Sequence, residues 1–107
     1  MAQKKELKKA EKLYNNYKYN AAIPYFEYYL DKEKKVKVVA TKTKLAYCYR
    51  MANKSTESEL LYSELIQEKR VRPILFFYYG EALMANGKYN EAKVLFKKYS
   101  KLKPNDE

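Results

Sequence analysis

The side chains that most often perform catalysis are scarce in this chain of 107 residues. It contains no histidine, which removes the commonest general base and the commonest metal ligand. Its single cysteine, Cys48, excludes an intramolecular disulfide and a cysteine-based zinc site. Because Cys48 has no imidazole partner and lies in the apolar segment LAYCY (residues 45–49), we interpret it as a packing residue.

The carboxylates and glycines offer no other route to catalysis. Glu11 and Glu81 lie in helix-forming sequence without an obvious second acidic partner. Gly80 and Gly87 neither follow a strand nor begin a glycine-rich turn, as a phosphate-binding loop requires. The sequence therefore predicts a protein that is not an enzyme and that uses no metal or cofactor.

The charge balance is strongly basic, with 23 Lys and Arg against 13 Asp and Glu and a net charge of +10. Such a field could attract nucleic acid, anionic lipid or an acidic protein. Only three of the basic residues are arginines, and the lysines are spread over several segments, which favours a solubilising role. Binding to nucleic acid or anionic lipid is kept as an alternative.

Hydrophobic spacing in residues 73–106 predicts two short amphipathic helices joined by a tight turn at Gly87. The apolar positions recur every three or four residues, at Phe76, Tyr79 and Leu83 and then at Ala92, Phe96 and Tyr99. Gly87 can adopt a positive φ at the end of the first helix, and Asn90 is the expected N-cap of the second. Gly80 and Ala92 are small enough to let the two helices approach closely.

The order of these features resembles the tetratricopeptide repeat (TPR), a helical hairpin of about 34 residues with small residues at the crossing, a turn and a closing proline, here Pro104. A shift of 34 residues recovers a weaker copy, in which Gly87 maps to Asn53. A shift of 70 aligns Lys88 with Lys18, which implies a two-residue insertion around residues 31–36. The resemblance implies an all-α, right-handed α-solenoid of three hairpins and about six helices, forming a single domain over residues 1–107 with repeats near 3–36, 37–72 and 73–106.

Periodicity and capping signals predict where the earlier helices lie. We expect helices at residues 3–15, from Asn20 onward, at 36–52, and at 57–69 with Ser55 as the N-cap. Pro24 falls near the first turn of the second helix, where a missing N–H is best tolerated. Val39 is expected to face the core together with Leu45.

The TPR resemblance also implies a binding surface, because the first helix of every repeat lines a concave groove. The residues placed there are Lys4, Leu7, Glu11, Tyr14, Thr43, Tyr47, Arg50, Met51, Ile74, Phe77, Glu81 and Met84. This mixture of aromatic, methionine, arginine and carboxylate groups suits an extended or helical peptide. A TPR subclass that binds acidic chaperone tails needs Lys, Asn and Arg where this chain has Leu7, Glu11, Ile74 and Tyr78, so that ligand is disfavoured.

A closer resemblance is to the N-terminal TPR region of bacterial OmpA-family envelope proteins. It is carried by the segments KKELKKAEKLY (4–14), YNAAIPYFEYYL (19–30), LAYCYR (45–50) and FFYYGEALMANGKYNEAKVLFKKY (76–99). The resemblance implies a fragment of a longer protein in the periplasm or at the outer membrane, with a cytoplasmic location as the alternative. No apolar run approaches 18 residues and the N-terminus has no hydrophobic core, so neither a transmembrane helix nor a signal peptide is expected in this chain.

The sequence thus predicts a non-catalytic scaffold that binds a protein or peptide partner in the groove. Nucleic-acid or lipid binding is one alternative. The other is a structural module that self-associates through its third repeat, where Val94, Leu95 and Leu102 would be left uncovered.

Overall fold

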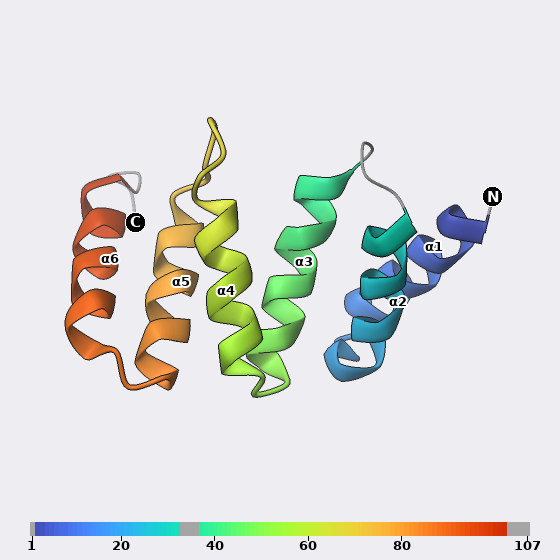
Figure 1. Cartoon of the computed structure of the whole chain (residues 1–107), viewed down its shortest axis with the longest axis horizontal. Helices are drawn as coiled ribbons and strands as arrows, with labels where there is room; N and C mark the ends of the chain where they lie inside the picture. Colours follow the sequence, from blue (N-terminus) through green and yellow to red (C-terminus); the bar gives the residue numbers. More distant parts are fainter. Residues whose placement is uncertain (1, 33–36, 103–107) are drawn as a thin grey trace. The chain divides into compact units, whose positions relative to one another are not determined.

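The computed structural model describes residues 2–32 and 37–102, and over these residues it contains six α-helices and no strand (Figure 1). The helices are α1 (Ala2–Asn15), α2 (Tyr19–Lys32), α3 (Val38–Met51), α4 (Ser55–Leu65), α5 (Ile74–Ala85) and α6 (Tyr89–Leu102). The predicted all-α fold of helical hairpins is confirmed. Pro104 and the insertion near residues 33–36 lie outside the described residues.

The helices group into two compact units, residues 1–54 and residues 55–107. In the first unit α2 packs against both α1 and α3, and in the second unit α5 packs against both α4 and α6. Each unit therefore combines one complete hairpin, α1–α2 or α5–α6, with a single additional helix.

The turns after α1, α3 and α5 share one geometry. Their central residues adopt a positive φ, with Tyr17 at 63°, Asn53 at 62° and Gly87 at 79°. In each turn the N–H of the following residue donates to a carbonyl five residues earlier, from Lys18 to Leu13, from Lys54 to Tyr49 and from Lys88 to Leu83. This is the Schellman arrangement that ends a helix. Positions can therefore be matched between α2, α4 and α6 by counting from Lys18, Lys54 and Lys88.

The core of the first unit comes from one face of each of its helices. On α3 the buried residues are Thr41, Leu45, Ala46 and Cys48, and Thr41, Leu45 and Cys48 follow one another at spacings of four and three. The prediction that Val39 faces the core was wrong: Val39 is 44% exposed, because it lies two residues, or about 200° of helix rotation, from Thr41. Cys48 is fully buried, and burial raises the pKa of its thiol to about 12, which confirms it as a packing residue.

In the second unit, α5 and α6 approach each other closely at Gly80, as the sequence predicted. A Cβ atom added to Gly80 on α5 would lie 2.6 Å from Cε1 of Phe96 on α6. Ala92 on α6 is also buried. Gly80 thus leaves the space that the edge of the Phe96 ring occupies, which explains the small residue at this position.

Several predicted helix ends differ from the structure, and Ser55, which was predicted as the N-cap of the fourth helix, is instead the first residue of α4. Helix α4 ends at Leu65 rather than at Lys69, because residues 67–70 are all polar or charged and exposed and offer no apolar side chain that would extend the buried face. Asn90 is not an N-cap: α6 begins at Tyr89, directly after the Schellman turn, and the N–H of Ala92 donates to the carbonyl of Lys88.

Candidate functional site

The first unit brings together four of the predicted groove residues, Glu11, Tyr14, Tyr47 and Arg50, on the side where α1 and α3 meet α2. Three tyrosine rings form the centre of this region, and we call them the tyrosine surface: Tyr14 from α1, Tyr19 from α2 and Tyr47 from α3. The ring centroids are separated by 5.6 Å (Tyr14 to Tyr19), 6.2 Å (Tyr14 to Tyr47) and 5.3 Å (Tyr19 to Tyr47). All three contacts are edge-to-face, the arrangement that aromatic quadrupoles favour.

The local sequence explains why these rings meet. Tyr14 lies in the last turn of α1 and Tyr19 is the first residue of α2, so the Schellman turn between them places both rings at one end of the hairpin. Phe26, which is fully buried, supports Tyr14 from below at a centroid distance of 6.1 Å. The three tyrosines themselves are half-buried, so part of each ring reaches the surface.

Charged groups border the tyrosine surface. The Lys44 ammonium lies 3.1 Å from Oε2 of Glu11 and 5.7 Å from the centroid of the Tyr14 ring. On the other side the Arg50 guanidinium lies 5.1 Å from the centroid of the Tyr47 ring, a cation–π distance. Burial, followed by the neighbouring Tyr47, raises the pKa of Tyr19, so its hydroxyl is neutral at physiological pH.

A hollow of about 380 Å³ adjoins this region at Glu11. It is lined by Lys4, Leu7, Lys8, Glu11, Tyr29 and Lys37. The floor is apolar, because Leu7 and Tyr29 are buried, and the charges around it are three lysines and one glutamate. Such a hollow suits a side chain that carries a negative charge on an apolar stem.

The other predicted groove residues of the first unit are not part of the tyrosine surface. Leu7 corrects the predicted set: it is only 6% exposed and belongs to the core, although it forms the floor of the hollow. The Thr43 hydroxyl donates to the carbonyl of Val39 on its own helix at 2.8 Å. Met51 and Lys4 are exposed. Tyr19 was missing from the prediction, since periodicity within the first helix of each repeat cannot identify a residue of the second.

In the second unit the predicted residues are Ile74, Phe77, Glu81 and Met84, all on α5. Phe77 packs onto α6, with centroid distances of 5.5 Å to Phe96 and 5.4 Å to Tyr99. Phe77, which was predicted as a groove residue, is half-buried, and truncating it would remove this packing onto α6. Met84 is 46% exposed, while Ile74 and Glu81 are half-buried.

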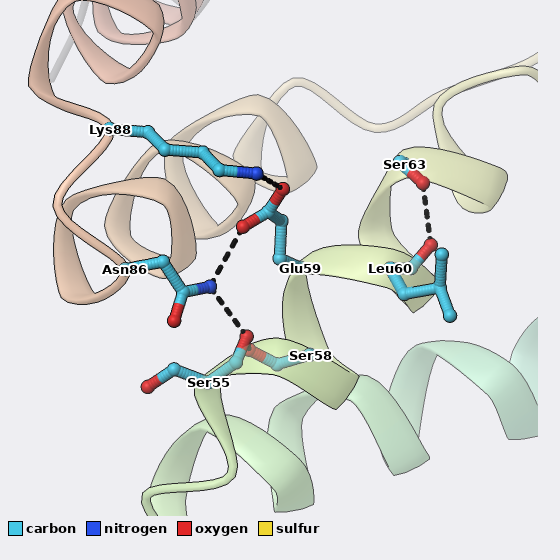
Figure 2. A network of polar contacts seen from close by, with 7 residues as sticks. All are labelled: Ser55, Ser58, Glu59, Leu60, Ser63, Asn86 and Lys88. Atoms are coloured by element: carbon cyan, nitrogen blue, oxygen red, sulfur yellow. Dashed lines mark hydrogen bonds and ion pairs between the residues drawn. The ribbon is translucent and has the colours of Figure 1, made fainter.

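A polar network in the second unit joins α4 to the turn after α5 (Figure 2). The carboxylate of Glu59 accepts hydrogen bonds from Asn86 Nδ2 and from Lys88 Nζ, both at 2.7 Å. Asn86 Nδ2 also donates to the backbone carbonyl of Ser55 at 3.0 Å. Since the Glu59 carboxylate, the Asn86 amide nitrogen and the Lys88 ammonium are all paired within the chain, we interpret the network as a contact that holds the end of α5 against α4.

This network predicts a pH-dependent contribution to stability. The hydrogen bond from Lys88 lowers the pKa of Glu59, so the bond stabilises the fold above the ordinary glutamate pKa of about 4.3. That contribution is lost as the pH falls through the lowered pKa. We expect Glu59→Gln to lower the melting temperature by about 2–5 °C at pH 7, and the difference from the wild type to shrink as the pH falls through the lowered pKa of Glu59.

The measurement is a thermal unfolding series by circular dichroism between pH 3 and pH 7. Glu68→Gln, at an exposed position after α4, is the matched control and should leave the melting temperature unchanged. A Glu59→Gln variant that is equally destabilised at pH 3 and pH 7 would show that packing, rather than the charge, carries the effect.

No helix among residues 2–32 and 37–102 is long and apolar enough to span a membrane. The same residues contain no cluster of three or more side chains suited to hold a metal ion. Comparisons with protein-family models, with curated proteins and with solved structures gave no match. The function must therefore be argued from the surfaces of the two units.

Proposed function

We propose that this chain is a non-catalytic protein-interaction module whose first unit binds a peptide segment of a partner protein on the tyrosine surface. The observation that carries the proposal is the meeting of three half-buried tyrosine rings from three different helices, with Arg50 at their border. Tyrosine and arginine are both enriched at protein interfaces, because the tyrosine ring offers a large contact area at a low cost in side-chain entropy and the arginine guanidinium offers several hydrogen-bond donors and stacks on aromatic rings.

The rings of the tyrosine surface already pack against one another without a partner. Each ring is held by the other two, and Tyr14 also rests on buried Phe26. Binding then orders few additional side chains, so more of the contact energy is available as affinity. The neighbouring hollow with its three lysines adds a place for an acidic side chain. We therefore propose a peptide that presents an apolar or aromatic residue to the rings and an acidic residue to the hollow.

The assignment to the TPR class is part of the same proposal. It is supported by the recurrence of one turn geometry at Tyr17, Asn53 and Gly87 and by the sequence resemblance of residues 73–106 to a TPR hairpin. A place in the bacterial cell envelope is proposed on the resemblance to OmpA-family proteins. Locating the native protein by cell fractionation tests that part independently.

Peptide binding can be tested by selecting ligands from a random peptide library displayed on phage, followed by fluorescence anisotropy with a labelled selected peptide. Arg50→Ala and Tyr47→Leu are expected to weaken binding about tenfold or more. Tyr47→Leu keeps an apolar side chain in contact with its neighbours, so that folding is retained. Lys12→Ala, at an exposed position on α1, is the matched control and should change the affinity less than twofold.

Two outcomes would contradict the proposal. One is a selected peptide whose affinity is unaffected by both surface variants. The other is binding that depends only on charge, with RNA or anionic vesicles competing fully and with affinity falling steeply as salt is raised. The second outcome would instead support the alternative of a basic surface that binds nucleic acid or lipid.

A further inference from the structure

In the second unit, helix α6 exposes residues whose matching positions on α2 and α4 are covered by the helix that follows them. Helices α2 and α4 are each followed in the chain by a helix that packs against them, α3 and α5 respectively. Helix α6 has no such neighbour among the described residues. The matching positions on α2, α4 and α6 can therefore be compared directly.

The first comparison concerns the apolar positions. Phe26 on α2 and Tyr62 on α4, both eight residues after the turn, are fully buried. Phe96 is the matching residue of α6 and is only half-buried. Three residues further on, Tyr29 and Leu65 are buried, whereas the matching Tyr99 is half-buried.

The residues on either side of the hairpin turn show the same difference in burial. Tyr14 and Tyr19 are half-buried and both contact Tyr47 of α3. The matching residues of the second unit are Met84 and Tyr89, which are 46% and 66% exposed. The α5–α6 hairpin thus leaves uncovered the positions that α3 covers on the α1–α2 hairpin.

The second comparison concerns the charge of the residues that contact the following helix, and it indicates which kind of helix would bind to α6. The Glu27 carboxylate on α2 accepts a hydrogen bond of 2.5 Å from the Tyr49 hydroxyl of α3. Glu59 on α4 accepts hydrogen bonds from Asn86 and Lys88 at the end of α5. Each preceding helix therefore offers a carboxylate to the helix that follows it.

Helix α6 carries a positive side chain at each of the two positions where α2 or α4 has this carboxylate. Lys97 stands where α2 has Glu27, and Lys93 stands where α4 has Glu59. Both lysines are exposed. A helix that docks here must supply the carboxylates itself.

We infer that Met84, Tyr89, Lys93, Phe96 and Lys97 form a docking face for an acidic amphipathic helix of a partner protein. The helix places an aromatic or apolar residue against Met84 and Tyr89, as α3 places Tyr47, and carboxylates against the two lysines. A second copy of this chain fits less well. The α5–α6 face would repel its own basic copy, and the outer face of α1 is also basic, with Lys4, Lys5, Lys8 and Lys12.

The inference can be tested with a peptide taken from the chain's own docking helix. The probe has the sequence of residues 38–54 with Tyr49→Glu and Lys54→Glu, which supplies acids toward Lys97 and Lys93, and with Cys48→Ala to prevent oxidation. A control peptide carries Tyr49→Lys and keeps Lys54. Affinities for the full chain are measured by fluorescence anisotropy at low salt.

We expect the probe with the two glutamates to bind the wild-type chain at least tenfold more tightly than the control peptide, because the glutamates at positions 49 and 54 meet Lys97 and Lys93. The double variant Lys93→Glu/Lys97→Glu should reverse this preference. Tyr89→Ala should weaken binding of the probe about fivefold while leaving the melting temperature unchanged, because this ring is largely exposed.

Three results would overturn the inference. They are no measurable binding of the probe with the two glutamates, a preference that the double charge reversal does not alter, and a chain that dimerises in sedimentation experiments through contacts that Tyr89→Ala removes. The last result would assign the face to a second copy. The substituted residues Tyr89, Lys93 and Lys97 all belong to the second unit, so failure of these tests leaves the proposed peptide site of the first unit standing.

Discussion

Phe26→Ala is expected to lower the free energy of unfolding by about 3–5 kcal/mol, the largest loss we predict for a single substitution. The Phe26 side chain is 0% exposed and is packed between helices of the first unit. Truncation removes its transfer free energy and leaves a cavity that the neighbouring helices fill only in part. It also removes the support beneath Tyr14, whose ring centroid lies 6.1 Å away.

The matched control is Phe96→Ala, the same substitution at the corresponding position of the second unit. Because Phe96 is half-buried, we expect a loss of roughly half that of Phe26→Ala. Urea unfolding followed by circular dichroism measures both. Equal losses for the two variants would mean that Phe96 is already covered, which would also argue against the docking face on α6.

Gly80→Leu is expected to destabilise the chain by about 1–3 kcal/mol through overpacking against α6. Even a methyl group at this position would lie 2.6 Å from Cε1 and 2.9 Å from Cδ1 of the Phe96 ring. The ring is half-buried and can move outward, and alanine raises helix propensity by about 1 kcal/mol over glycine, so Gly80→Ala should cost little. A leucine cannot be accommodated by the same small movement.

The interaction with Phe96 can be isolated with a double variant. Gly80→Leu combined with Phe96→Ala should recover part of the loss, so the two changes should be non-additive by about 1 kcal/mol. Lys97→Leu, an added leucine at an exposed position of α6, should stay within about 0.5 kcal/mol of the wild type. Additive losses from Gly80→Leu and Phe96→Ala would mean that another neighbour limits the space at Gly80.

The candidate binding residues illustrate what a resemblance can and cannot provide. Glu11, Tyr14, Tyr47 and Arg50 were predicted from the groove positions of the TPR pattern, and the structure brings these four together. Leu7 and Phe77 were predicted with them but serve packing. A position on the first helix of a repeat is not sufficient to predict exposure, because the neighbouring helix decides which side chains it covers.

Periodicity by itself determined the helices, their turns and their small contact residues. The spacing of Phe76, Tyr79 and Leu83 places these residues on one face of a helix. Gly87 indicates a turn, because glycine adopts a positive φ at little cost in free energy. These are local properties that neighbouring residues fix. The predicted end of α4 and the predicted N-cap of α6 were wrong, because the first and last turns of a helix depend on the residues that pack beside them.

Only the tertiary structure determined the pairs that lie far apart in the chain. Lys44 and Glu11 are 33 residues apart, Lys88 and Glu59 are 29 apart, and Tyr49 and Glu27 are 22 apart. No periodic pattern connects such residues, since each pair exists only because two helices pack in one register. The lysines at positions 93 and 97 are likewise visible in the sequence. They indicate a binding preference only because the structure shows that the matching carboxylates, Glu59 and Glu27, accept hydrogen bonds from residues of, or directly after, the next helix.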